Sequence, residues 1–203
     1  KKSETLYENT EPTSIGYVYH AYMSENTADE LDALDLQNAL LHAAVVSENS
    51  SLLKQAENAG LQEEVKEAEK TSLPFTMTDR KSFEWNHGVL KIKRKNGSFR
   101  TQITMRPGYE YYLRFRGLKI KKSEKNALWA NVTMGDLVRE FMISDETYDF
   151  HLDRDNYMVT LGSVTEEQTK ELRFRMNGPA VYTLQDIEIV EVSMENYHES
   201  VQD

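Results

Sequence analysis

The second part of the chain, from residue 83 onward, consists of short segments in which apolar and polar residues alternate. Alternation with a period of two predicts β-strands that are buried on one face. Turn residues separate the segments, and no helical pattern intervenes. The sequence therefore predicts a mainly β fold, an antiparallel β-sandwich of jelly-roll type, preceded by a helical segment. The predicted strands cover residues 89–95, 99–105, 109–120, 128–134, 137–143, 157–161, 170–176 and 184–194.

Two of these segments share the string Leu-Arg-Phe-Arg, at residues 113–116 and 172–175. In each string the apolar side chains alternate with the arginines, so Leu and Phe are predicted to face the core and both Arg to face outward. The dipeptide Asn96-Gly97 lies between two alternating segments. Both residues tolerate a positive φ, and the pair therefore predicts a hairpin with a type I′ turn.

The first part of the chain has a different pattern, with one predicted strand and a helix. Aromatic and β-branched residues predict the strand at residues 15–22. Thr27 and Glu30 have the spacing of a capping box, so we expect a helix over residues 27–46. Its apolar face would consist of Leu31, Leu34, Leu41 and Val45.

An acidic segment and a proline follow this helix. Residues 50–70 have helical spacing, interrupted by Gly60, and predict a second helix. Residues 71–79 contain Pro74 and are expected to form a linker. We therefore expect an N-terminal segment at residues 1–80 with one short strand and one or two helices, and a β-sandwich domain at residues 81–203.

The composition excludes several classes of protein. The 203 residues carry a net charge of -10, and this argues against binding to nucleic acid, which requires a surplus of Lys and Arg. The absence of cysteine excludes disulfides and thiolate chemistry. No apolar run approaches the roughly 20 residues needed to cross a bilayer. Because the sequence begins with Lys1, we expect it to be a piece of a longer protein.

The sequence contains no nucleophile, zinc or phosphate-loop motif, so we assign no catalytic residue, metal site or cofactor to it. His20 and His42 lie in or beside apolar segments, where a structural role is the more common one. His151 lies near Asp153, and strand neighbours at that spacing merely share a face. One alternative is a calcium site in the acidic segment that contains Asp145, Glu146, Asp149, Asp153 and Asp155.

The candidate ligand-binding residues are aromatic and basic. Aromatic rings can pack on the apolar face of a sugar, and the candidates are Trp85, Trp129, Tyr112 and Tyr148, although burial of each Trp in the core is the more common arrangement. If the two Leu-Arg-Phe-Arg strands share a sheet, their arginines form a cationic patch suited to an anionic polymer. That patch would comprise Arg114, Arg116, Arg173 and Arg175. Alternatively, Glu110, Glu171, Glu188 or Glu191 pairs with these arginines.

The sequence resembles the extracytoplasmic part of the YfhO family of bacterial multi-pass membrane proteins. The resemblance rests on the segments GYVYHAY at residues 16–22 and QNALLHAAVV at 37–46, and on YYLRFRG at 111–117 and LQDIEIVEV at 184–192. It implies a parent protein similar to membrane glycosyltransferases that decorate envelope polymers such as lipoteichoic acid, with its catalysis in membrane segments absent from this chain.

This chain would then be a non-catalytic accessory domain on the extracytoplasmic face of the cell membrane. It would bind or position a glycan or an anionic envelope polymer, and the parent's other segments would provide the contact with the membrane. A stand-alone carbohydrate-binding or adhesion module is the main alternative. A glycosidase with two paired carboxylates is the third.

Overall fold

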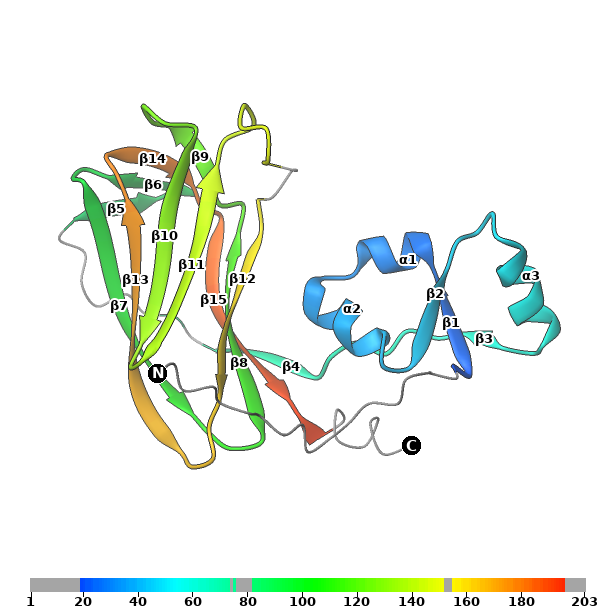
Figure 1. Cartoon of the computed structure of the whole chain (residues 1–203). Helices are drawn as coiled ribbons and strands as arrows, with labels where there is room; N and C mark the ends of the chain where they lie inside the picture. Colours follow the sequence, from blue (N-terminus) through cyan, green and yellow to red (C-terminus); the bar gives the residue numbers. More distant parts are fainter. Residues whose placement is uncertain (1–18, 74, 76–81, 152–154, 196–203) are drawn as a thin grey trace, which may run out of the picture. The chain divides into compact units, whose positions relative to one another are not determined.

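The computed structural model describes residues 19–73, 75, 82–151 and 155–195, apart from the side chain of Phe83. In this part of the chain the protein is mainly β, with three antiparallel sheets of four strands each and one parallel sheet of three strands. The chain divides into two compact units, residues 1–69 with 194–203 and residues 70–193. Figure 1 labels α1 to α3 in the first unit.

The first unit contains a small parallel sheet with helices in its crossovers. Its elements are β1 (Ala21–Ser24), α1 (Glu25–Glu30), α2 (Ala33–Ala39), β2 (Ala43–Val46), α3 (Ser51–Asn58) and β3 (Gln62–Glu63). The strand order is β2-β1-β3. Met23, Ala28 and Ala39 form a small buried core, against which Leu31, Leu36 and Val65 pack. The sheet therefore has its own apolar centre.

The prediction of one continuous helix over residues 27–46 is wrong. Leu31 is extended, with φ -75° and ψ 144°, and this conformation ends α1. The carboxylate of Asp32 then accepts hydrogen bonds from the backbone N–H groups of Leu34 and Asp35, both at 3.0 Å, and begins α2. The first helix is capped by Ser24 rather than Thr27. Helical spacing alone did not indicate that a second cap interrupts the pattern.

The Asp32 cap leads to a testable prediction. Asp32→Ala removes the acceptor for two backbone N–H groups, and we expect this to cost about 1 kcal/mol of local stability. Hydrogen exchange at the amides of α2 measures the loss. Asp29→Ala, at an exposed position inside α1, is the control and should leave α2 unchanged. Equal exchange in the two variants would contradict the capping role.

Two further predictions for the first unit need correction. The helix predicted over residues 50–70 ends at Asn58, since Gly60 has a φ of 79° and turns the chain into β3. The strand predicted at residues 15–22 is observed at Ala21–Ser24. Residues 15–18 of that prediction lie outside the described residues.

The second unit contains the antiparallel sheets. Its strands are β4 (Lys70–Leu73), β5 (Phe83–Asn86), β6 (Val89–Ile92), β7 (Asn96–Met105), β8 (Tyr109–Arg116), β9 (Lys119–Lys122), β10 (Ala127–Met134), β11 (Leu137–Ser144), β12 (Tyr157–Ser163), β13 (Gln168–Asn177), β14 (Ala180–Thr183) and β15 (Asp186–Ser193). The sheet orders are β11-β10-β13-β7, β12-β8-β15-β4 and β5-β6-β14-β9.

The strand boundaries of the second unit differ from the prediction at three places. Lys70–Leu73, largely assigned to a linker, pairs with β15 as β4. The segment 109–120 is divided into β8 and β9 at Gly117, which has a φ of 62°. Asn96 and Gly97 do not form a hairpin turn; they begin β7, and β6 belongs to a different sheet. Gly97 instead lets the chain pass close to Ile92, where a Cβ atom would clash.

The core of the second unit contains side chains from all three of its sheets, and two of these sheets pack against each other through their apolar faces. The alternation predicted for the repeated strings is confirmed, because Leu113 and Phe115 on β8, and Leu172 and Phe174 on β13, are all buried. The rings of Phe115 and Phe174 lie 4.7 Å apart between their centroids, so the two strands meet through their apolar faces. Figure 1 shows the sheet that contains β13 in front of the sheet that contains β8.

Candidate functional site

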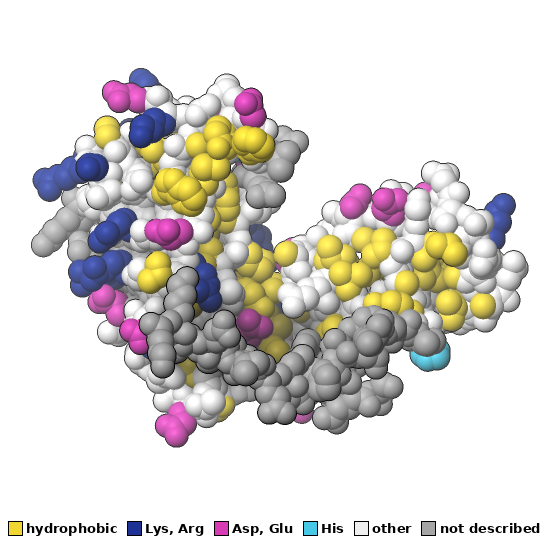
Figure 2. All heavy atoms as spheres, viewed as in Figure 1, with side chains coloured by type: hydrophobic (Ala, Val, Ile, Leu, Met, Phe, Trp, Pro, Cys, Tyr) yellow, Lys and Arg dark blue, Asp and Glu magenta, His cyan; other side chains and the backbone are white. Residues whose placement is uncertain are grey.

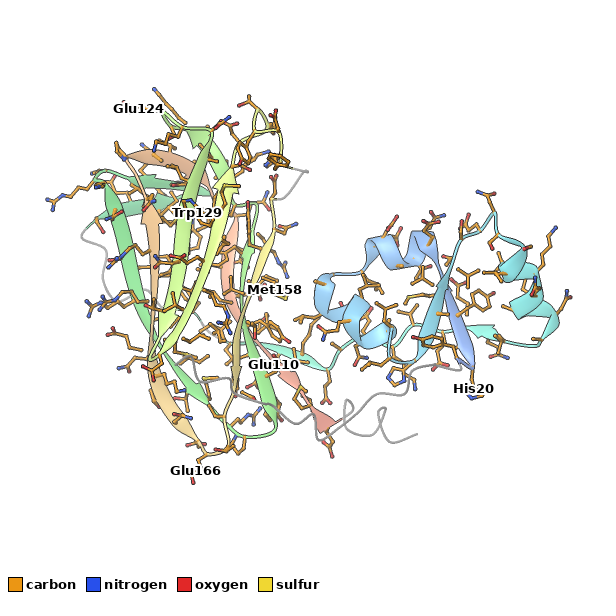
Figure 3. All side chains as sticks on the ribbon, in the orientation of Figure 1. His20, Glu110, Glu124, Trp129, Met158 and Glu166 are labelled. Atoms are coloured by element: carbon orange, nitrogen blue, oxygen red, sulfur yellow. The ribbon has the colours of Figure 1, made fainter. Side chains whose placement is uncertain are left out.

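Trp129 projects from β10 away from the core. Its neighbours along the strand, Leu128 and Ala130, point inward and are buried, whereas 57% of Trp129 is exposed. This follows from the alternation of a strand with one buried face. Figure 3 labels Trp129 on the front sheet. The structure thus places one of the two predicted tryptophans at the surface.

Met142 on β11 is directly opposite Trp129, and polar and charged side chains follow on the same face of the sheet. Asn131 is opposite Glu140 on β11 and Arg175 on β13, and Thr133 is opposite Arg173. Residues directly opposite each other have Cβ atoms about 4.5–5.5 Å apart, so these side chains are neighbours. We call the outward-facing residues Trp129, Asn131, Glu140, Arg173 and Arg175 the Trp129 face. Figure 2 shows hydrophobic and basic side chains interspersed over this front sheet.

The two arginines of the Trp129 face differ in their electrostatic environment. Arg173 lies 3.5 Å from one carboxylate oxygen of Glu171. The other oxygen of the same carboxylate lies 3.5 Å from Arg100. Arg175 is exposed and makes no ion pair with any residue that the structure describes. Its guanidinium therefore keeps all its donors available to a ligand.

The two Leu-Arg-Phe-Arg strands do not share a sheet, so the condition under which their four arginines would form one patch is not met. Arg114 and Arg116 lie on β8, and Arg173 and Arg175 lie on β13, in two different sheets. Because the two strands face each other through their Leu and Phe side chains, their arginines point away from each other. Alternation established which side chains face outward, but it carried no information on which strands are neighbours.

The alternative of pairing with glutamate is confirmed for Arg114 and Arg116. Glu188 on β15 lies 2.7 Å from Arg114 and 3.1 Å from Arg116. It also accepts a hydrogen bond from the hydroxyl of Ser72 on β4. The Arg114 side chain is only 11% exposed. Glu188 therefore connects three strands of one sheet, β4, β8 and β15.

Two predicted aromatic residues lie away from the Trp129 face. Tyr112 on β8 is half-buried, and burial, together with hydrogen bonding to Glu110, raises the pKa of its hydroxyl. Trp85 on β5 is also half-buried; it packs against the core, and its indole N–H donates to the carbonyl of Leu184 at 3.0 Å. That hydrogen bond connects β5 to the end of β14.

The acidic segment after β11 is held by hydrogen bonds and ion pairs. Lys119 lies 2.7 Å from Glu146 and 3.3 Å from Asp155. Asp145 accepts hydrogen bonds from the backbone and hydroxyl of Thr147, at 2.9 and 2.6 Å. Asp153 lies outside the described residues, so its proximity to His151 stays a prediction. Within the described ranges, no group of three His, Cys, Asp or Glu side chains is arranged to hold a metal ion.

His151 lies between Ser144, which is buried, and Asp155, which is half-buried. The Ser144 hydroxyl lies 2.9 Å from Nδ1 of His151, and Nε2 lies 3.5 Å from Asp155. Ser144 and His151 are 4% and 5% exposed, so the hydroxyl is not presented to a substrate. These contacts fasten the segment to β11. Of the other predicted histidines, His20 is exposed and His42 half-buried, and burial, followed by the charge of Lys66, lowers the pKa of His42.

The Trp129 face includes two residues that the sequence analysis missed. Asn131 and Glu140 were not singled out, although Asn131 follows Trp129 at the strand period of two, a signal that could have identified it. The pairing of Glu140 with Asn131 required the structure. Together the face offers an aromatic ring, a guanidinium without a carboxylate partner among the described residues, an amide and a carboxylate. These groups can stack on a sugar and hydrogen-bond to its hydroxyl or phosphate groups.

The model of a family described as bacterial membrane protein YfhO matches residues 1–203, the whole chain. The resemblance seen in the sequence is confirmed. A search of curated proteins found no match. In the part of the chain that is described, no helix has the length and apolar character needed to cross a membrane.

Proposed function

Because the chain belongs to the YfhO family of bacterial membrane proteins, we propose that it is a non-catalytic extracytoplasmic domain of such a protein. In this proposal it binds or positions a cell-envelope glycan of the lipoteichoic-acid type. The observation that supports it best is Trp129, which is 57% exposed on a sheet face with Arg175 and Asn131 on the neighbouring rows. Tryptophan and arginine are enriched among the residues that contribute most to binding at protein interfaces.

The chemistry of the face suits a polymer that carries both sugar and phosphate. The indole ring can pack on the apolar side of a pyranose, while Asn131 and Glu140 can donate to or accept from its hydroxyl groups. Arg175 can bind a phosphate in bidentate geometry, and the described residues provide no carboxylate to compete for it. An open sheet face also accommodates an extended chain.

We further propose that the second unit is a jelly-roll-like β-sandwich whose outer face carries the ligand. The contact of Phe115 with Phe174 between two antiparallel sheets supports this proposal. In such an architecture the inner faces fill the core, and the outer faces remain available for binding.

The test is the binding of purified lipoteichoic acid to Trp129→Ala and Arg175→Gln. We expect each variant to weaken binding roughly tenfold, equivalent to about 1.4 kcal/mol. Thermal stability should stay nearly unchanged, since both side chains are exposed. Isothermal titration calorimetry measures the first quantity and a thermal melt the second.

Two matched control variants test whether a loss of binding is specific to the Trp129 face. Leu52→Ala removes a side chain that is 59% exposed on α3, and Arg116→Gln removes the same charge from the other sheet. Both controls should bind like the wild type. If Arg116→Gln weakens binding as much as Arg175→Gln, or if Trp129→Ala binds normally, the Trp129 face is not the binding surface.

A further inference from the structure

A pocket of about 510 Å³ lies at the carboxyl-terminal edge of the parallel sheet in the first unit. Its lining includes Ser24 and Glu63, the last residues of β1 and β3, and Glu48, which follows the end of β2. Side chains of α1 and α3 complete the walls. We call it the strand-end pocket. It lies within the first unit and shares no residue with the Trp129 face.

The strand order explains why a pocket forms here. The chain leaves β1 for β2 on one side and then returns past β1 to β3, with helices in both crossovers. Right-handed crossovers in opposite directions place their helices on opposite faces of the sheet. Figure 1 shows α1 and α2 on one side of these strands and α3 on the other. In open parallel sheets, ligands bind beyond the carboxyl ends of the strands at the point where the connections diverge.

The lining of the pocket has an unusual balance of charge. Four of its side chains are glutamates, and none of the described side chains that line it is Lys, Arg or His. Glu63 accepts hydrogen bonds at 3.2 Å from the backbone N–H of Ser24 and the hydroxyl of Thr27. Glu48 accepts from the amide of Asn26 at 2.7 Å. These neutral donors fix the positions of two carboxylates without neutralising them.

The other two carboxylates have no fixed partner among the residues that the structure describes. Glu30 on α1 and Glu57 on α3 are exposed, and neither makes an ion pair or a side-chain hydrogen bond with a described residue. An anion entering this pocket would meet four like charges, whereas a cation would relieve their mutual repulsion. Tyr22 and Leu53 add an aromatic ring and an apolar side chain to the same wall.

We propose that the strand-end pocket binds a small organic ligand that carries a protonated amine. The ammonium group lies among the carboxylates of Glu30, Glu48 and Glu57, and the rest of the ligand packs against Tyr22 and Leu53. The proposal joins three observations: the pocket, its place at the diverging strand ends, and carboxylates held without a cation. It does not depend on the glycan-binding function proposed above.

The test uses the whole protein and two probe pairs that differ mainly in the amine. Glucosamine is compared with glucose, and ethanolamine with ethylene glycol, by NMR titration of the backbone amides of Ser24, Asn26 and Thr27. We expect saturable shifts with at least one amine and none with its neutral counterpart. Glu30→Gln with Glu57→Gln should weaken that binding at least tenfold. The two bonded glutamates stay intact in this double variant, so the fold is retained.

The outcomes that overturn the proposal are distinct. Glu25→Gln, which removes an exposed charge from α1 outside the pocket, is the control. If Glu25→Gln weakens amine binding as much as the double variant Glu30→Gln with Glu57→Gln does, the attraction is a general effect of negative charge and is not specific to the pocket. Equal shifts with the neutral probes would mean that hydroxyl groups are recognised instead. Stronger shifts of the same amides with calcium chloride would mean that the pocket binds a divalent cation instead. If neither amine shifts these amides, the pocket does not bind amines and the proposal is wrong.

Discussion

Phe174→Ala is expected to destabilise the second unit by about 3–5 kcal/mol. The Phe174 side chain is fully buried, and its ring lies 4.7 Å from that of Phe115, 4.9 Å from that of Phe99 and 6.1 Å from that of Phe141. Truncation removes this buried area and leaves a cavity between two sheets whose backbones cannot close over it. Urea denaturation followed by circular dichroism measures the loss.

Phe150→Ala provides the matched control for the same chemical change. Phe150 is 69% exposed and makes one edge contact with the ring of Tyr148 at 5.9 Å. Its truncation should cost at most about 1 kcal/mol. If the two variants lose similar stability, the aromatic cluster does not join the facing sheets, and the architecture described for the second unit needs revision.

The sequence predicted the second unit better than the first because the two units depend on different signals. Alternation identifies a strand with one buried face, and it correctly assigned the inward and outward residues of β8 and β13. In the first unit the helices have only six to eight residues. At that length a single cap such as Asp32 decides where a helix begins, and it interrupts an apolar pattern that otherwise continues.

For the candidate site, the sequence predicted which side chains face outward but not which strands lie next to each other. Alternation placed Arg114 and Arg175 outward, but each strand has two sides on which neighbours can pair, and the choice of neighbours depends on long-range contacts. The hairpin turn predicted at Asn96-Gly97 is wrong for a related reason. The local preference for a hairpin turn was overridden because β6 and β7 join different sheets. The exposure of Trp129 follows from the period of β10, whereas its proximity to Arg175 follows from the pairing of β10 with β13.

Glu188→Gln is the second variant for which we expect a large effect, a loss of about 3 kcal/mol at neutral pH. The substitution takes from Arg114 the carboxylate that lies 2.7 Å away, in a place where the Arg114 and Glu188 side chains are only 11% and 12% exposed. It also weakens the connection among β4, β8 and β15. Arg116→Gln is the control: that side chain is 49% exposed, so its ion pair with Glu188 should contribute no more than about 1 kcal/mol.

The pH dependence of the stability of Glu188→Gln tests whether the charge of the Glu188 carboxylate causes this loss. Burial by itself would raise the pKa of Glu188, but hydrogen bonds from Ser72 and Arg114 and the charges of Arg114 and Arg116 outweigh it, and the pKa lies below its ordinary value of 4.5. The unfolded chain therefore takes up a proton at Glu188 more readily than the folded protein does. As a result, the stability that the Glu188 carboxylate contributes is complete above about pH 5 and declines as the pH falls. Urea denaturation from pH 7 to pH 3 should therefore show the wild type and Glu188→Gln converging in acid. A stability difference that stays constant down to pH 3 would mean that the carboxylate charge is not what holds these strands.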